Sequence, residues 1–209
     1  MNRRRDLASA VREDHRALAR RPRVDDVREV ALTLFAERGY HGTSMSDIAA
    51  VLGVRVPTLY SHIRSKQELL ADIAVATTEA VLTDFELATD GVADMSERLR
   101  RAIEAYALRH ATHPREALVV NRDIFSLEEP TQSAVLASRH HHERSVRALI
   151  IAGVEAGVFH VRSPAIASFA MLEMSVSVAR WFRPEGPMSA EEVASLHGEF
   201  ALNIAKDAA

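Results

Sequence analysis

Apolar residues recur along this chain at the three- and four-residue spacing of helices, and the strict alternation typical of strands is rare. The first clear stripe begins after Asp25, stops at Gly39, and has these members on one helix face: Val27, Val30, Ala31, Leu34 and Phe35. Comparable stripes continue to the end of the chain. The pattern therefore predicts an all-helical protein.

Two short helices are predicted after the first stripe. Ser44 or Ser46 caps one helix, which ends at Gly53. The next runs from Val56 to Ile63, with Pro57 in its first turn, where a missing N–H costs no hydrogen bond. Two short helices joined by a glycine-containing turn form the helix-turn-helix arrangement, in which the outer side of the second helix enters a major groove.

Longer helices are predicted to follow. Ser65 caps the fourth helix, and a long helix runs from about Thr131 to the stop at Gly157. Pro164 opens another helix, whose apolar residues are nearly continuous. Ser189 and Glu192 form a capping box for the last helix.

Composition and charge narrow the class of protein. The 209 residues include no Cys, which excludes disulfides, thiolate nucleophiles and Cys-ligated metals, and we expect a cytoplasmic protein. No apolar run approaches the roughly 20 residues that span a bilayer, so no membrane partner is expected. Residues 1–70 carry 13 Lys and Arg against 9 Asp and Glu, a net charge of +4, whereas the remaining residues carry −7. This asymmetry indicates that the N-terminal part meets an anion.

Specific motifs lie within this basic part. In chain order they are Ala36-Glu37-Arg38-Gly39-Tyr40, Thr43-Ser44-Met45, Asp47-Ile48-Ala49, Gly53-Val54, Pro57-Thr58-Leu59-Tyr60-Ser61-His62-Ile63 and Ser65-Lys66-Gln67-Glu68-Leu69-Leu70. Residues 24–70 thereby resemble the DNA-binding domain of TetR-family transcriptional repressors. The resemblance implies a three-helix helix-turn-helix domain over residues 23–70 and a larger helical ligand-binding and dimerisation domain over 71–209. The Arg clusters of residues 1–22 predict a flexible N-terminal extension before them.

The resemblance also implies which residues contact double-stranded operator DNA. Lys66 matches a phosphate-contacting lysine, and Thr43 and Ser46 lie where a backbone phosphate is held near a helix N-terminus. The sequence departs from the family at Arg55, which can bind guanine with two hydrogen bonds, and at Val56, which offers only apolar contact to a thymine methyl. The remaining predicted contacts share the outer side of the second short helix: Pro57, Thr58, Tyr60, Ser61 and His62.

A second resemblance concerns the effector. Residues 180–193 are similar to the corresponding stretch of actinobacterial TetR-type regulators of steroid and fatty-acid catabolism, which respond to acyl-CoA thioesters. An acyl-CoA needs an apolar tunnel with basic residues at its mouth. The candidate ligand-binding residues are Tyr106, Arg122, Phe125, Arg139 and Glu173, with Arg162 as a further basic candidate. For Glu173, a charge within an apolar run, pocket and dimer-interface roles both remain open.

Enzyme and metal chemistry have no support in the sequence. No P-loop, G-x-G-x-x-G or G-x-S-x-G motif occurs, and the H-E-x-x-H motif fails because Val146 replaces its second His. Two sets of histidines suggest a metal site: residues 140–142 with Glu143, and His110 with His113 three residues apart. The consecutive histidines point in different directions on a helix, so no three of them converge. We expect no catalytic residue, no metal and no cofactor, and solvated or pocket-lining histidines.

These features together predict a homodimeric repressor that binds a near-palindromic operator and is released by a small apolar or amphipathic effector, an acyl-CoA being one candidate. The last two helices are expected to pair with those of a second copy. Two alternatives remain: an activator or regulator without a small-molecule effector, and an all-helical enzyme or lipid carrier that binds DNA nonspecifically.

Overall fold

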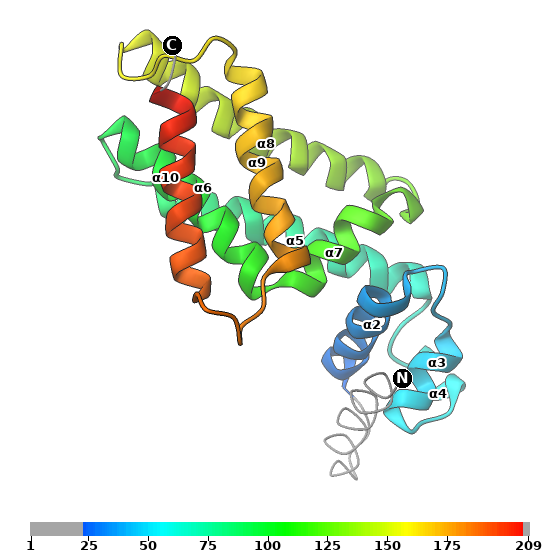
Figure 1. Cartoon of the computed structure of the whole chain (residues 1–209). Helices are drawn as coiled ribbons and strands as arrows, with labels where there is room; N and C mark the ends of the chain where they lie inside the picture. The colour runs from blue at the N-terminus through cyan, green and yellow to red at the C-terminus, as the bar shows by residue number, and fades with distance from the viewer. Residues whose placement is uncertain (1–22, 207–209) are drawn as a thin grey trace.

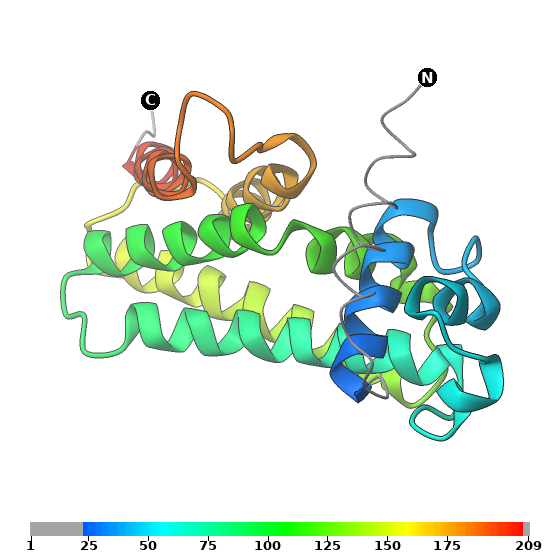
Figure 2. The same cartoon turned by 90° about the horizontal axis from the view of Figure 1, so that it is seen from below.

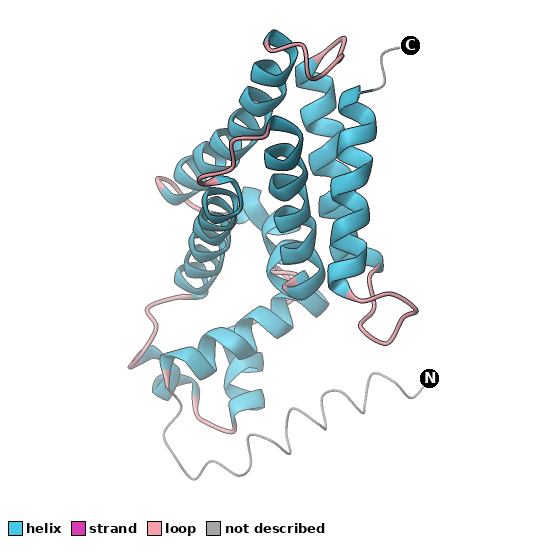
Figure 3. Cartoon of the chain, turned by 90° about the vertical axis from the view of Figure 1, so that its left-hand side faces the viewer, coloured by secondary structure: helices cyan, strands magenta, loops and turns pink. Residues whose placement is uncertain are grey.

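The computed structural model describes residues 23–206, which form helices and connecting loops with no strand (Figures 1 and 3). The predicted extension over residues 1–22 lies outside the described residues. In chain order the elements are α2 (Val24–Arg38), α3 (Met45–Leu52), α4 (Val56–Tyr60), α5 (Lys66–Thr89), α6 (Met95–Thr112), α7 (Pro114–Asp123), the 3₁₀ helix η1 (Ile124–Ser126), α8 (Thr131–Glu155), α9 (Pro164–Trp181) and α10 (Ala190–Lys206). The all-helical prediction is confirmed, as is a small helix-turn-helix unit followed by a larger helical one.

The small unit is built on one apolar cluster. Val27 and Phe35 of α2 are fully buried, as the stripe predicts, and they share this cluster with Ile48 of α3, Leu59 of α4 and Leu69 of α5. Burial of each large aliphatic or aromatic side chain contributes roughly 1.5–3 kcal/mol. This cluster therefore fixes how the short helix α4 is oriented.

Helix α6 lies at the centre of the larger unit. It packs against α5 and α8 and against α9 and α10, and α9 and α10 lie on the opposite side of α6 from α5 (Figure 2). Gly198 brings α10 close to α6, since a Cβ at this position would lie 2.9 Å from Cγ of Arg100. Gly153 of α8 similarly leaves room for the buried ring of Phe159, which a Cβ would overlap.

Several predicted helix ends are confirmed. Helix α8 begins at Thr131 as expected, Pro164 opens α9, and Ser65 caps α5 by accepting a hydrogen bond from the N–H of Glu68 at 3.1 Å. Before α10, the N–H of Ser189 donates to the Glu192 carboxylate at 2.7 Å, and the N–H of Glu192 donates to Ser189 Oγ at 3.2 Å. These are the two bonds of the predicted capping box.

The structure decides between the two predicted caps of α3, and it places the end of α4 earlier than predicted. Ser44, not Ser46, caps α3, because its Oγ accepts from the N–H of Asp47 while that carboxylate accepts from the N–H of Ser44. Helix α4 ends at Tyr60 instead of Ile63. The chain then turns, with the N–H groups of His62 and Ile63 both donating to the Leu59 carbonyl, and this turn keeps Ile63 buried although it follows the helix.

The small and large units share the long helix α5 and an apolar cluster. The predicted boundary at residue 70 falls inside α5, which continues from the small unit into the large one (Figure 1). Val119 and Ile124, from α7 and η1, and Val135 of α8 belong to the same apolar cluster as α2 and α3. None of the helices over residues 23–206 has the length and apolarity required to cross a membrane.

Candidate DNA-binding surface and effector pocket

The turn between α3 and α4 is set by local chemistry. Gly53 ends α3 in the left-handed conformation, with φ 68° and ψ 26°, which costs a glycine little and other residues more. Pro57 then stands in the first turn of α4, where its fixed φ favours the helix. The Asp47 carboxylate accepts hydrogen bonds from the side chain and N–H of Ser44, and these bonds lower its pKa. The turn therefore holds α4 at a defined angle to α3.

Helix α4 buries one side and exposes the other. Leu59 is fully buried, whereas 52% of the Tyr60 side chain is exposed. Thr58 is half-buried, and so is Val56, which packs against the apolar cluster. The other predicted contacts on and around this helix are exposed: Arg55, Pro57, Ser61 and His62, together with Ser46 at the start of α3. The structure thus presents one polar surface, named here the α4 surface, made of these residues with Thr58 and Tyr60.

Thr43 does not belong to this surface. Its side chain is 2% exposed, and its Oγ1 lies 3.2 Å from the carbonyl oxygen of Leu34 and 3.0 Å from that of Gly39. A buried hydroxyl that donates to the end of α2 is not available to a DNA phosphate. The expected phosphate contact by the Thr43 side chain is wrong for this structure, because the hydroxyl satisfies backbone groups instead.

The ammonium group of Lys66 is held by two backbone carbonyl groups. Its Nζ donates to the carbonyl oxygens of Tyr40 and Thr43, each at 2.8 Å, and lies 4.1 Å from the centre of the Tyr40 ring. An ammonium group has three N–H donors, so one remains for a phosphate. Lys66 fixes the loop before α3, and its contact with DNA stays a prediction.

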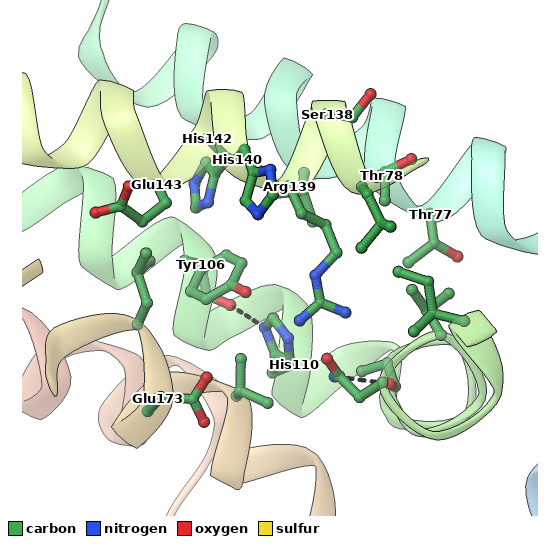
Figure 4. A pocket seen from close by; sticks show the side chains of 18 of the residues that line it. Thr77, Thr78, Tyr106, His110, Ser138, Arg139, His140, His142, Glu143 and Glu173 are labelled. Atoms are coloured by element: carbon green, nitrogen blue, oxygen red, sulfur yellow. Dashed lines mark hydrogen bonds between the residues drawn. The ribbon is translucent and has the colours of Figure 1, made fainter. Parts of the chain in front are cut away.

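The larger unit holds a partly open cavity of about 370 Å³. Helices α5, α6, α7, α8 and α9 line it together with η1 (Figure 4). Four of the five predicted ligand-binding residues line this one cavity, although they lie far apart in the sequence: Tyr106, Phe125, Arg139 and Glu173. Glu173 lines the cavity and is exposed in the single chain, so the pocket and dimer-interface roles both stay predictions.

Two histidines form part of the cavity wall. The Tyr106 ring lies with its centre 4.4 Å from that of His110 and 4.7 Å from that of His142. Burial lowers the pKa of both histidines to about 4, so both are neutral at neutral pH. Burial also raises the pKa of Tyr106 to about 12.

These histidines were singled out in the sequence but not assigned to the site. The signal that places them inward is helical spacing: His110 follows Tyr106 by four residues, and His142 follows the buried Val135 by seven. Within residues 23–206 no three His, Asp or Glu side chains are arranged to hold a metal ion.

Arg122 and Arg162 do not line the cavity. Arg122 donates from its guanidinium to the carbonyl oxygens of Phe35 and Ala36 and to the Asp123 carboxylate. These carbonyls end α2, and a cation there satisfies groups that the helix leaves free. Arg162 is exposed, outside the cavity wall. The ligand role expected for Arg122 is therefore wrong in this structure, because its side chain faces the DNA-binding unit.

Helix α7 and η1 separate the cavity from the DNA-binding unit. One side of this segment faces the cavity with Ala117, Val120, Asn121 and Ile124. The other side contacts the small unit: Arg115 pairs with Glu29 at 2.6 Å, Asp123 accepts from the N–H of Tyr40 at 3.3 Å, and the Ser126 carbonyl accepts from Gln67 at 3.1 Å. We name this segment, residues 114–126, the α7 bridge. The sequence pattern does not reveal it, because partners 59 to 86 residues apart do not show in local spacing.

Comparison with known proteins matches both units of the chain. Residues 27–73 match the family described as bacterial regulatory proteins, tetR family, and residues 92–205 match the tetracyclin repressor-like C-terminal domain. The HTH-type transcriptional repressor KstR2 of Mycobacterium tuberculosis is 25% identical over 169 residues, which cover 79% of this chain and 84% of the relative.

Two solved structures extend the comparison. PfmR, a TetR family transcriptional regulator from Thermus thermophilus, has a TM-score of 0.76 and 38% identity, covering 85% of this chain and 97% of its own. AibR, solved in complex with isovaleryl coenzyme A and operator DNA, has a TM-score of 0.76 and 24% identity, covering 86% and 97%, and so supports the fold alone. This chain belongs to the TetR family of bacterial DNA-binding transcriptional regulators and is not an enzyme.

Proposed function

We propose that this protein is a homodimeric repressor that binds a near-palindromic operator and releases it when a small amphipathic effector enters the cavity. The observation that carries the proposal is the α4 surface, with Tyr60 half-exposed above the buried Leu59, on a unit attached to a ligand-sized cavity. A helix with this division presents its polar side to a major groove. The repressor role is supported by the similarity to KstR2, which is a transcriptional repressor.

Dimerisation is supported by apolar side chains on the outer sides of α9 and α10. Ile166, Phe169 and Trp181 of α9 are 68%, 52% and 51% exposed, and Phe200 of α10 is 47% exposed. Exposed apolar groups gathered on neighbouring helices are typical of an interface. A two-fold pair through these helices carries two α4 surfaces, which suit two operator half-sites roughly 34 Å apart.

The α7 bridge and α5 both connect the cavity to the DNA-binding unit, so both can transmit the effect of a bound effector to DNA binding. A ligand that displaces the cavity side of the bridge also displaces Arg115, Arg122 and Asp123, which hold the small unit. The dimer has one arrangement in which the spacing of the two α4 surfaces fits the operator and another in which it does not. A ligand that binds the second arrangement more tightly increases its population and so releases the dimer from DNA. An acyl-CoA remains one candidate effector, as AibR was solved with isovaleryl coenzyme A.

The test is fluorescence anisotropy with DNA from the intergenic region upstream of the gene, with a scrambled duplex as competitor. We expect the wild-type protein to bind the genomic duplex more tightly than the scrambled one at moderate salt, with a stoichiometry of two chains per site. Equal affinity for both duplexes would contradict the proposal.

A substitution on the α4 surface sharpens this test. Tyr60→Ala removes a half-exposed side chain that has no role in the apolar cluster, so we expect specific affinity to fall about tenfold with little change in thermal stability. Leu87→Ala, at a 76% exposed position on α5, is the matched control and is expected to bind as the wild type does. Unchanged affinity of the Tyr60 variant would refute the assigned role.

A regulator that needs no small-molecule effector, including an activator, is the second candidate function. It is distinguished by whether any ligand dissociates the complex with DNA, and by whether expression of the regulated gene rises or falls when this gene is deleted.

A further inference from the structure

Arg139 brings a positive charge into the cavity without a partner of its own. Its side chain reaches from α8 across the cavity toward His110 (Figure 4). Among residues 23–206 it forms no ion pair and no hydrogen bond, whereas Arg147, two turns further along α8, is paired with Glu143 at 2.6 Å. A guanidinium group in a partly enclosed site is costly unless an anion or hydrogen-bond acceptor satisfies it.

The other polar groups near Arg139 suit the same anion. Tyr106, on the neighbouring wall, forms no hydrogen bond through its hydroxyl within the described part of the chain, and no fully buried polar atom there lacks a partner, so this hydroxyl remains accessible from the cavity. His110 uses Nδ1 against the Tyr106 carbonyl at 2.7 Å, which leaves Nε2 free. The cavity therefore offers a charged donor and a hydroxyl donor within one region.

The two carboxylates of the wall do not neutralise this charge. Glu143 is held by Arg147 and by Ser168 Oγ at 2.7 Å. Glu173 comes from the opposite wall, on α9, and does not reach Arg139 (Figure 4). More than half of the remaining lining residues are apolar, and the larger aliphatic ones among them are Val81, Val120, Ile124, Leu136, Leu172 and Val176.

We propose that the effector of this protein is a compact amphipathic carboxylate, whose carboxylate binds the Arg139 guanidinium and the Tyr106 hydroxyl while its apolar body lies against the aliphatic wall. This inference names the chemical class of the effector and rests on the function proposed above. The planar guanidinium matches a carboxylate with two parallel hydrogen bonds.

A free acid fits the cavity better than a coenzyme A thioester. The thioester has no charge at its acyl end, where its carbonyl offers Arg139 one neutral acceptor in place of the two charged oxygens of a carboxylate, and its charge lies on phosphates instead. Arg139 is the single arginine or lysine of the described cavity wall, which also carries two glutamates. A volume of about 370 Å³ is close to the lower end of the roughly 300–1,000 Å³ found for ligand sites.

The experiment compares acids with uncharged and thioester derivatives of the same tail. Octanoate, octanamide and octanoyl coenzyme A, and the corresponding three derivatives of cyclohexylacetic acid, are titrated calorimetrically into the full-length protein without DNA. We expect at least one acid to bind at least tenfold more tightly than its amide and its thioester, since hydrogen bonds to charged groups typically contribute more than tenfold in affinity.

Variants assign this preference to one residue. Arg139→Gln is expected to remove the preference for acid over amide, and Arg139→Lys to retain part of it because the charge remains without the planar fork. Arg144→Gln, at an exposed position on the same helix, is the control and should keep the full preference. If Arg139→Gln does not fold, as judged by circular dichroism, the comparison of derivatives on the wild type decides alone.

The proposal is overturned if no acid binds at its solubility limit, if amides or thioesters bind as tightly as acids, or if Arg139→Gln keeps the preference. These results do not depend on DNA, so failure here is distinct from failure of the proposed repressor function, which the duplex titrations measure without any ligand.

Discussion

The Thr43 hydroxyl connects the loop before α3 to the end of α2, through the carbonyl groups of Leu34 and Gly39. Its role is therefore structural, although it stands next to exposed residues of the DNA-binding unit. A threonine at the start of a helix-turn-helix gives no sequence signal that separates a phosphate contact from an internal hydrogen bond. Only the fold of the loop, which buries the hydroxyl, separates the two.

Thr43→Val tests this assignment. Valine keeps the volume but loses the hydrogen bonds, so we expect the free energy of unfolding to fall by about 1 kcal/mol. Affinity of the folded protein for DNA should remain within about twofold. Urea denaturation and anisotropy titration measure the two quantities. Ser46→Ala, at an exposed position, is expected to leave stability unchanged, and a strong loss of DNA affinity by the Thr43 variant at wild-type stability would contradict the structural role.

The buried histidines predict how stability depends on pH. His142 contacts the rings of Phe85 and Tyr106, and the ionisable groups that act on its charge are His110, His141 and Glu143. Burial lowers its folded-state pKa from 6.5 to about 4. Between these values the unfolded chain binds a proton that the folded protein does not, so stability is complete above pH 6.5 and is lost as pH falls toward 4.

We expect His142→Phe to reduce this loss. The pKa difference of His142 lowers the free energy of unfolding by roughly 3 kcal/mol as the pH falls from 6.5 to 4. This value is an upper estimate because His110 titrates nearby. Melting temperatures measured across this pH range should fall less steeply in the variant than in the wild type. The same measurement on His141→Gln, at an exposed site, should reproduce the wild-type slope. Equal slopes for wild type and His142→Phe would show that His142 is not the group responsible.

At the level of helices, spacing predicted the elements well but their ends less well. The α2 stripe is buried as predicted because its members lie on one face, and the starts of α5 and α9 follow from Ser65 and Pro164. The apolar pattern predicts the end of α4 three residues too late, because Ile63 continues the pattern although it belongs to the turn after the helix. Periodicity reports which residues are buried, not whether the backbone between them is still helical.

The site was predictable to a similar extent. Among the cavity residues, Glu173 is predictable as a charge within an apolar run and Arg139 as a basic candidate for an anionic effector, whereas Tyr106 belongs to the apolar stripe of its helix. Arg122 was misplaced, since its partners are backbone carbonyls of α2, which no residue pattern identifies. The bridge between cavity and DNA-binding unit could be found only from the packing of α7 against α2.

Close packing of α8 against Phe159 leads to a prediction about helix geometry. A Cβ at position 153 would overlap the Phe159 ring, which is 1% exposed and cannot move into solvent freely. Gly153→Ala should therefore lower the free energy of unfolding by about 1–3 kcal/mol, although alanine has the higher helix propensity.

A second glycine serves as the control. Gly157, just beyond α8, has open space around it but a φ of 70°, so Gly157→Asn should be tolerated with a smaller loss. Chemical denaturation of the two variants measures the difference. If Gly153→Ala is as stable as the wild type, Phe159 is not held in the position described.

For the whole molecule, we expect the outer sides of α9 and α10 to determine the state of assembly. Phe200→Glu places a charge in the expected interface, and we expect a chain that elutes as a monomer at concentrations where the wild type is dimeric. Light scattering after size-exclusion chromatography measures the mass. DNA affinity should fall together with dimerisation, since one subunit reads one half-site.

Leu87→Glu is the matched control, because Leu87 is 76% exposed on α5, away from both helices. It should remain a dimer. A dimeric Phe200 variant with full DNA affinity would place the interface elsewhere.

The two-sided α7 bridge restricts how ligand specificity can change in this protein. A substitution at a bridge position alters both the fit of the ligand and the contacts that hold the small unit. Under the proposed function, a change of ligand preference made there therefore carries a risk that the protein never binds the operator or never releases it. Leu172 and Val176 line the cavity from α9, a helix that contributes no described residue to the apolar cluster of the small unit. A biosensor for another compound is therefore best designed by varying that wall while the bridge stays intact.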